Sequence, residues 1–389
     1  MEDSGRDGGI WDDDVLNKQV SVEQEQLYDQ DGEANITEPF DPRDVDIVSK
    51  PMVISNMVDQ LKYGDIILDP DFQRSPDLWD AVKQSRLIES LIINIPLPTF
   101  YFELCGDDKY IVVDGLQRLF AMKQFMALEK TDKNRLRLKG LEYLRDFEGC
   151  LFEELPPKIQ RRIKSQDVMA YIIRPETPEN VKTSIFTRIN TGGLMLEPAE
   201  IRNSVYRGQA AELLKELAHG EAFVKATRHK IPSSRMLDRE FVNRFLAFYL
   251  LGVNQYSGNL EEFMNAVMSI LKCAEKDVLD QCRIDFTRSM VCARELFGDY
   301  AFRRKRTNGT YAALNRPLFE AVSVNLAKLK EEECQILQKK KEQMKAKYEK
   351  LFDNTEFVTA ISDGTAKIGN VKIRHKMIRD MFRRIIEND

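Results

Sequence analysis

The segment YIVVDGLQRLF places a carboxylate, a glycine and a guanidinium close together, at Asp114, Gly115 and Arg118. Its β-branched residues precede helical spacing, which predicts a strand, a tight turn and the start of a helix. The first N–H groups of a helix lack intrahelical acceptors and attract anions. Gly115 permits close backbone approach, Arg118 can fork onto two phosphate oxygens, and Gln117 can donate or accept beside it. The segment therefore predicts a phosphate site.

Asp114 can play three roles at this turn. Its carboxylate can hold Mg²⁺, accept a hydrogen bond from a ribose hydroxyl, or cap the following helix. In the first role Asp114 would be the metal ligand and, with Arg118, would carry the chemistry on a phosphate. The structural alternative is a turn in which the arginine serves only the fold, because Asp-Gly turns with a nearby arginine are common.

A second Gln-Arg pair, Gln73 and Arg74, lies in DPDFQRSPDLW, between an extended segment and a helix. Two such pairs on loops of one lobe predict that they converge on the same nucleotide. The alternative is that Arg74 forms a surface ion pair with one of the neighbouring aspartates, which would contribute little to stability.

The stretch INTGG contributes Asn190, Gly192 and Gly193 at the end of a predicted helix. These residues can form a loop that closes over the nucleotide, with the Asn190 amide as its polar contact. They can equally form an ordinary helix C-terminal cap, where Asn and Gly are usual.

The cationic loop FRRKRTNGTY, residues 302–311, can track a phosphate backbone. Tyr311 could stack on a base there. The alternative is a solvated charge run. The candidate DNA-binding residues are Arg303, Arg304, Lys305 and Arg306.

These residues need a scaffold, and the chain divides into three parts. Residues 46–175 alternate short strands with helices, whereas residues 176–389 are almost all helical in pattern. This order predicts an α+β protein, with an α/β lobe followed by a mostly α-helical lobe. In the second lobe the charged stretch 315–352 predicts a surface helix or helix pair. Residues 1–45 are acidic and aperiodic, which predicts a mostly disordered arm.

The net charge of −5 hides an asymmetry between the arm and the rest of the chain. Residues 1–46 hold 15 acidic and 3 basic side chains, a balance of −12, so the other 343 residues carry +7. A basic body suits phosphate-bearing partners. The arm is therefore expected either to solubilise the protein or to compete with nucleic acid for the body.

Other features narrow the class of protein. The six cysteines form no C-x-x-C pair and only three histidines accompany them, so neither a zinc site nor a disulfide framework is favoured. No apolar stretch approaches the roughly 20 residues needed to cross a bilayer, and the first residues are acidic. We expect a cytoplasmic protein without a membrane partner.

Several of these motifs resemble one known family. FQR, LW, RLIESLIINIPLPTFYF and YIVVDGLQRL are similar, in this order, to the N-terminal domain of GmrSD-type restriction enzymes, the domain of unknown function 262 family. That family belongs to the ParB/sulfiredoxin-like superfamily. Its D-G-Q-Q-R hallmark stands here as D-G-L-Q-R, with Leu116 at the third position. Its F-x-x-I-N-x-x-G-x-x-L-x-x-x-E-I segment stands at Phe186, Ile189, Asn190, Gly193, Leu196, Glu200 and Ile201. The resemblance extends over about residues 46 to 385.

The resemblance implies a ParB/sulfiredoxin-like lobe over residues 46–175 that binds an NTP, ATP or GTP, with Mg²⁺. It implies slow NTP hydrolysis in a DNA-associated or phage-defence setting, with a nuclease or another defence protein as partner. Two alternatives stay open. One is a non-enzymatic DNA-binding or adaptor protein in which nucleotide sets the conformation, and the other is a ParB-like metal-dependent nuclease. No histidine-rich segment of the HNH type stands near His375.

Overall fold

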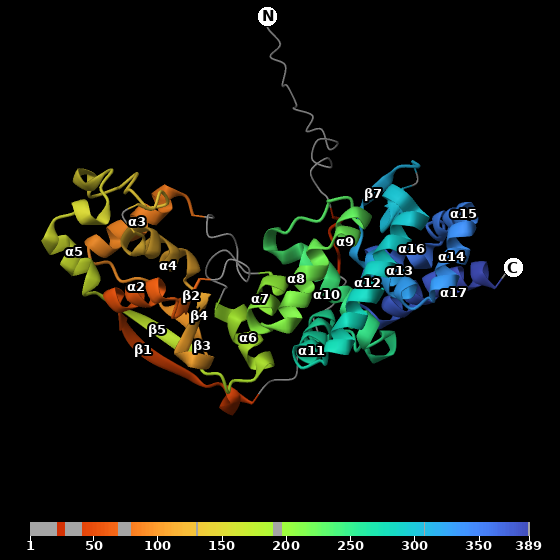
Figure 1. The fold of residues 1–389 in the computed structure, drawn as a ribbon, viewed down its shortest axis with the longest axis horizontal. Coiled ribbons are helices and arrows are strands. Elements are labelled where there is room, and N and C mark those ends of the chain that lie inside the picture. The colour runs from red at the N-terminus through yellow and green to blue at the C-terminus, as the bar shows by residue number, and fades with distance from the viewer. Residues whose placement is uncertain are drawn as a thin grey trace, which may run out of the picture. The chain divides into compact units, whose positions relative to one another are not determined.

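The computed structural model describes residues 22–27, 41–68, 79–129, 131–189, 197–306 and 308–387. The chain forms two compact units, which Figure 1 shows as ribbons. The sheet unit runs to Tyr206, and the helical unit begins at Arg207 and also contains residues 22–27. The division falls about thirty residues beyond the boundary expected at residue 175, because the helices over residues 179–205 are grouped with the sheet. No helix of the described ranges is long and apolar enough to cross a membrane.

The sheet unit contains five strands and the helices that cover them. Its elements are η1 (Pro42–Asp44), β1 (Ile47–Val53), α2 (Ile54–Tyr63), β2 (Ile66–Ile67), α3 (Ala81–Ile92), β3 (Phe100–Cys105), η3 (Gly106–Asp108), β4 (Lys109–Asp114), α4 (Leu116–Met122), η4 (Lys123–Ala127), η5 (Arg145–Phe147), η6 (Phe152–Glu154), α5 (Pro157–Lys164), β5 (Asp167–Ile173), α6 (Glu179–Ile189) and α7 (Pro198–Val205).

The five strands form one mixed sheet in the order β1-β5-β3-β4-β2. The β1–β5 and β3–β4 pairs are antiparallel, and the β5–β3 and β4–β2 pairs are parallel. Helices α2, α3 and α4 lie against the sheet (Figure 1). Alternate residues of β3 face this side, so Phe100 and Phe102 are buried in a core with Leu119, Met122 and Phe125. The α/β character expected for this part of the chain is confirmed.

The helical unit is built almost entirely from helices. Its elements are α8 (Gln209–His219), α9 (Glu221–Ala226), η8 (Ser234–Met236), α10 (Leu237–Leu250), η9 (Val253–Gln255), α11 (Leu260–Lys272), α12 (Lys276–Phe297), η10 (Gly298–Tyr300), β6 (Arg303–Lys305), β7 (Tyr311–Leu314), α13 (Arg316–Ala327), α14 (Glu331–Lys339), α15 (Lys341–Leu351), α16 (Thr355–Ser362) and α17 (Ile368–Ile386).

Two local predictions in this unit differ from the structure. The stretch 315–352 was expected to be a surface helix or helix pair, but α13 is buried along its length because it packs against α10, α12 and α17. The cationic loop at residues 302–311 is a short antiparallel hairpin made of β6 and β7. The mostly helical character of the unit is confirmed.

Residues 22–27, which we call the docked segment, are packed on the helical unit although they lie within the arm that was expected to be mostly disordered. The Glu23 amide donates to the Leu314 carbonyl at 2.8 Å, which extends the β7 edge. Further along, the amides of Thr365 and Ala366 donate to the carbonyls of Gln26 and Leu27, both at 3.0 Å. These bonds satisfy backbone groups on both sides. The part of the arm over residues 1–21 and 28–40 lies outside the described residues.

Glu25 of the docked segment enters a buried charge network in the helical unit. The Arg244 guanidinium donates to both Glu25 oxygens, at 2.7 and 2.8 Å, and its Nε donates to Glu320. On its other side Glu320 accepts from Arg374 Nε at 2.6 Å and lies 3.3 Å from His375 Nε2. All five side chains are buried, so each charge depends on its partners for the solvation it has lost.

Acidification is expected to destabilise the helical unit. Burial lowers the pKa of His375 below its ordinary value of 6.5, so the unfolded chain takes up a proton that the folded chain does not. Burial acts to raise the pKa values of Glu25 and Glu320, but the arginines hold both below the ordinary 4.5. Each of these three groups contributes stability that is present above its unfolded pKa and is lost as the pH falls.

The midpoint of thermal unfolding should therefore decline below about pH 6.5 and decline more steeply below about pH 4.5. Circular dichroism melts over a pH series would measure it. A midpoint that stays constant from about pH 7 down to about pH 4 would contradict this expectation.

Candidate functional site

The predicted strand, turn and helix meet at Gly115. Strand β4 ends at Asp114, Gly115 adopts φ 102° and ψ 10°, and α4 begins at Leu116. Helix α4 continues into a π-helical turn, η4, a distortion that is often found at functional sites. The Leu119 amide donates to the Gly115 carbonyl at 2.9 Å. The N–H groups before it stand at the start of the helix, as the sequence predicts.

Gly115 is required at this position for two independent reasons. Its positive φ lies in the left-handed region, which favours glycine. A Cβ added there would also stand 2.5 Å from Cδ1 of the Phe100 ring, closer than real Cβ atoms approach. The turn is therefore packed directly on the aromatic core of the sheet, and its backbone is held in one conformation.

Arg118 is buried beneath the turn, and its guanidinium is held by the protein. Nη2 donates to Asp114 Oδ2 at 2.7 Å and to the Thr99 carbonyl at 3.1 Å, and Nη1 donates to the Pro98 carbonyl. The guanidinium also lies over the Phe100 ring, 4.4 Å from its centroid. In this structure the guanidinium bonds only groups of the protein, namely two backbone carbonyls and the Asp114 carboxylate. This is the structural alternative given for Arg118 in the sequence analysis.

The Asp114 carboxylate is the accessible charged group of the turn. Its side chain is 37% exposed, against 10% for Arg118, and Oδ2 is the oxygen that accepts from Arg118. Within the described ranges no donor is recorded for Oδ1, which is thus open to a ligand. Burial lowers the pKa of Arg118, and the neighbouring Asp114 charge acts in the opposite direction. The carboxylate therefore stabilises the charged form of the buried guanidinium. The turn combines an oriented carboxylate with a nearby buried positive charge.

Two tyrosines beside Asp114 were missed by sequence reasoning. Tyr101 lies opposite Asp114 in the β3–β4 register, and Tyr171 lies opposite Tyr101 in β5. Their rings are stacked, with centroids 5.2 Å apart. Burial, followed by Tyr171 and Asp114, raises the pKa of Tyr101. The alternation in TFYFE could have placed Tyr101 on the face opposite Phe100 and Phe102, but the parallel pairing that brings Tyr171 beside it has no local signal.

A second buried contact fixes α6 to this same face of the sheet. Lys182 of α6 donates to Glu103 of β3 at 2.8 Å and to the Pro175 carbonyl at 3.2 Å, and both charged side chains are buried. Glu103 follows Tyr101 by two residues on β3, so both point to the same face. This ion pair anchors α6 to the sheet.

The other predicted site residues have different outcomes. Gln117 lies half-buried on α4, next to the turn. Five of the predicted nucleotide ligands lie outside the described residues, namely Gln73, Arg74, Asn190, Gly192 and Gly193. The four basic residues from Arg303 to Arg306 belong to the helical unit, not to the unit that carries Asp114. Their placement as nucleotide or DNA ligands stays a prediction.

No group of three or more His, Cys, Asp or Glu side chains is arranged to hold a metal in the part of the chain that the structure describes. A Mg²⁺ ion at the turn would thus take Asp114 Oδ1 together with phosphate oxygens of a nucleotide and water. Sites of this kind suit Mg²⁺, which keeps several waters and is held through one or two carboxylates and substrate phosphates.

Comparison with known proteins adds one finding. Residues 54–207 match the model of the GmrSD restriction endonuclease N-terminal domain. The match includes the DGLQR turn and the FTRIN segment, and it ends at the boundary between the two units. No curated protein and no solved structure is significantly similar to the chain. The resemblance expected beyond residue 207 stays a prediction.

Proposed function

Residues 54–207 of this chain belong to the GmrSD restriction endonuclease N-terminal domain family, and we propose that the sheet unit binds a nucleoside triphosphate, ATP or GTP, at the Asp114–Gly115 turn. The observation that carries this proposal is the orientation of Asp114. A buried arginine holds one carboxylate oxygen, and the other is free to act beside the start of a helix.

The phosphates would bind at the backbone of the turn. Gly115 brings the main chain close to a ligand, and the first amides of α4 point away from their own helix. The positive charge of Arg118 would attract the phosphates without contacting them. Its guanidinium would also hold the Asp114 carboxylate in place. It would not wrap around the phosphates itself, because its donors already serve Pro98, Thr99 and Asp114.

The base would lie against the paired rings of Tyr101 and Tyr171. These rings share the face and the register of Asp114, so a nucleotide with its phosphates at the turn could reach them. Stacking of a base on an aromatic ring is favourable and tolerates different bases. This contact supports nucleotide binding without selecting ATP over GTP.

The proposed hydrolysis of the NTP would be slow. Water would attack the terminal phosphoryl group and displace the nucleoside diphosphate, with the Asp114 carboxylate orienting the water. Leu116 supplies no side-chain amide at the start of α4, where the family hallmark has glutamine. The engaged Arg118 favours a second candidate function, in which nucleotide binds and sets the conformation without being hydrolysed. Measurement of phosphate release from bound NTP separates the two.

The setting we propose is restriction of foreign DNA. The family description names a restriction endonuclease, and a separate nuclease chain or another defence protein would then be the partner of this protein.

Asp114→Asn is expected to weaken Mg²⁺-dependent NTP binding by about tenfold or more, the loss typical of one charged hydrogen bond. The variant keeps the shape of the side chain but removes the charge that Mg²⁺ and Arg118 use. Calorimetric titration with ATP and with GTP, each with and without Mg²⁺, would measure it.

Asp108→Asn is the matched control, because Asp108 is an exposed aspartate at the other end of the same β3–β4 hairpin. Its φ of 57° is one that asparagine tolerates well. Equal NTP affinities for the two variants would contradict the proposed role of the turn.

A further inference from the structure

A cationic groove lies in the helical unit, which is not the unit that carries Asp114. It has a volume of about 1040 Å³ and runs between the docked segment, the β6–β7 hairpin and the start of α13. Four arginines line it, namely Arg303, Arg304, Arg306 and Arg316. Two carboxylates, Glu23 and Glu25, enter it from the docked segment, so its charged lining carries a net +2.

The arginines of the groove are incompletely paired. Neither Arg303 nor Arg306 has a carboxylate within 4.0 Å among the described residues. In the same ranges, the buried Nε atoms of Arg303, Arg304 and Arg316 have no hydrogen-bond acceptor. Burial lowers the pKa of Arg303, and the nearby charge of Arg228 lowers it further. Buried donors without acceptors carry a free-energy cost that an anionic ligand would relieve.

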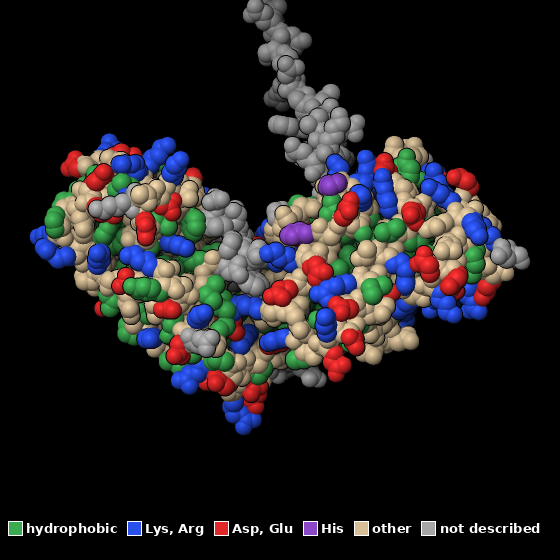
Figure 2. All heavy atoms as spheres, in the orientation of Figure 1, with side chains coloured by type: hydrophobic (Ala, Val, Ile, Leu, Met, Phe, Trp, Pro, Cys, Tyr) green, Lys and Arg blue, Asp and Glu red, His purple; other side chains and the backbone are tan. Residues whose placement is uncertain are grey.

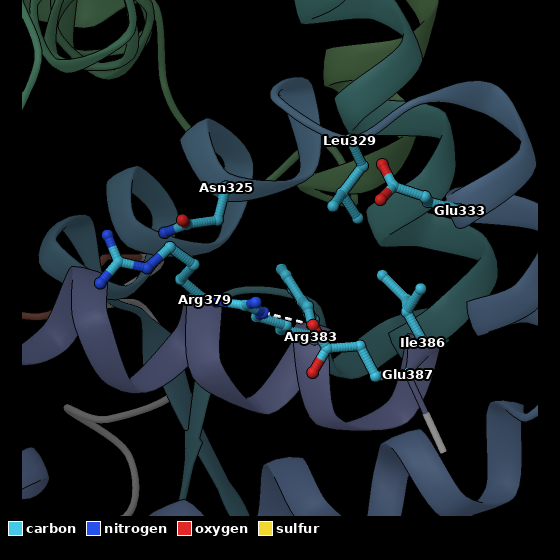
Figure 3. Close-up of a pocket in the computed structure, with 8 residues that line it drawn as sticks. Asn325, Leu329, Glu333, Arg379, Arg383, Ile386 and Glu387 are labelled. Carbon is cyan, nitrogen blue, oxygen red and sulfur yellow. Dashed lines mark hydrogen bonds and ion pairs between the residues drawn. The ribbon is translucent and has the colours of Figure 1, made fainter. Parts of the chain in front are cut away.

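A second pocket of the same unit provides a contrast. Figure 3 shows its lining on α13, α14 and α17, where Arg379 and Arg383 are accompanied by Glu333 and Glu387. Arg383 is paired with Glu387, as the dashed line marks, and the charges of the lining cancel. On the face drawn in Figure 2, basic and acidic side chains are likewise interspersed. The groove thus differs from this pocket in its excess of positive charge.

Glu23 shows what kind of ligand the groove accepts. One carboxylate oxygen accepts from Asn315 Nδ2 at 2.8 Å, and the other lies 3.3 Å from Arg304 Nη2. The two oxygens of the carboxylate occupy positions that two oxygens of a phosphate could take. The docked segment thus places its own carboxylate, that of Glu23, in the arginine-lined groove.

We propose that this groove binds the phosphodiester backbone of DNA without sequence preference, and that Glu23 occupies part of the site. Contacts with phosphates carry affinity but no sequence information. Tyr311 is not available to stack on a base, because its ring is stacked on Tyr300 with centroids 3.9 Å apart and its hydroxyl donates to Glu349 at 2.7 Å. The groove is therefore suited to the backbone, and the stacking role expected of Tyr311 is replaced by an intramolecular one.

The test uses the full chain and a short mixed-sequence DNA duplex, with no nucleotide added. The Arg303→Gln/Arg306→Gln variant is expected to bind the duplex at least about tenfold more weakly than the unmodified protein. The logarithm of its DNA affinity should fall less steeply with the logarithm of the salt concentration, by the amount expected for the loss of about two phosphate contacts. The Arg379→Gln/Arg383→Gln variant removes the same number of guanidiniums from the pocket of Figure 3 and should keep both properties. Fluorescence anisotropy at several salt concentrations measures affinity and slope together.

Glu23→Gln should have the opposite effect and tighten binding, because it removes a competing charge while an amide can still bond Asn315. Asp114→Asn should leave DNA binding unchanged, so failure of the groove and failure of the nucleotide site can be told apart. The proposal is overturned if the unmodified protein does not bind the duplex, or if the two double-arginine variants lose the same affinity. Melting temperatures of all variants confirm that they are folded.

Discussion

A chain that begins at residue 28 is expected to be less stable by about 3 to 5 kcal/mol than a chain that begins at residue 22. The shorter chain lacks Glu25, which gives both carboxylate oxygens to the buried Arg244. Glu320 would then have to serve Arg244 and Arg374 alone. An uncompensated buried charge is one of the few single defects with an effect of this size.

The chain that begins at residue 22 is the control, since it loses the preceding residues but keeps every contact of the docked segment. Glu25→Gln in the full chain isolates the charge from the backbone bonds, because it leaves the amides of Thr365 and Ala366 with their acceptors. Denaturant titration gives the free energy of unfolding for each protein. Equal stabilities of the two truncated chains would show that the docked segment contributes nothing to the fold.

Arg118→Ala is expected to destabilise the ligand-free sheet unit by about 1.5 to 3 kcal/mol, the range for a lost hydrogen bond to a charged group. Two backbone carbonyls and the Asp114 carboxylate would lose their donor, and Phe100 would lose the cation over its ring. NTP binding should weaken as well, because Asp114 would no longer be held in place. Arg118→Lys keeps the positive charge but loses the planar, two-pronged guanidinium. Its stability and NTP affinity should lie between those of the unmodified protein and those of Arg118→Ala.

The control for this change is Arg161→Ala, because Arg161 is an exposed arginine of α5 in the same unit. Thermal melts without nucleotide and calorimetry with nucleotide are both needed. If Arg118→Ala melted like Arg161→Ala yet failed to bind NTP, the guanidinium would belong to the ligand and not to the fold.

The local pattern of the sequence was sufficient for the scaffold of the turn. The change from β-branched residues to helical spacing at Asp-Gly placed the end of β4 and the start of α4 correctly. The alternation in TFYFE and the run DVMAYII likewise placed β3 and β5. These features depend on neighbours within a few residues, and such neighbours are visible in a single sequence.

Contacts between distant residues were not visible in this way. The acceptors of Arg118 at Pro98 and Thr99 lie on the loop before another strand, and no pattern in the sequence indicated them. Phosphate binding by Arg118 stays a prediction. The docked segment has the composition of a disordered arm, yet Arg244 lies 219 residues from Glu25. Helix α13 has a charged continuation that suggests a surface, whereas its burial comes from three helices elsewhere in the chain. Composition reports what a segment contains and gives no information on what packs against it.

The course of the docked segment also bears on the synthesis of the protein. The segment leaves the ribosome before the sheet unit, but its partners in β7 and before α17 are made more than 280 residues later. The sheet unit is thus inserted between two parts of the helical unit, and it can fold as soon as it is complete because its strands are contiguous in the chain. Until α10 emerges, Glu25 lacks Arg244, its partner in the buried charge network. The helical unit is therefore completed by a segment that is made before the sheet unit.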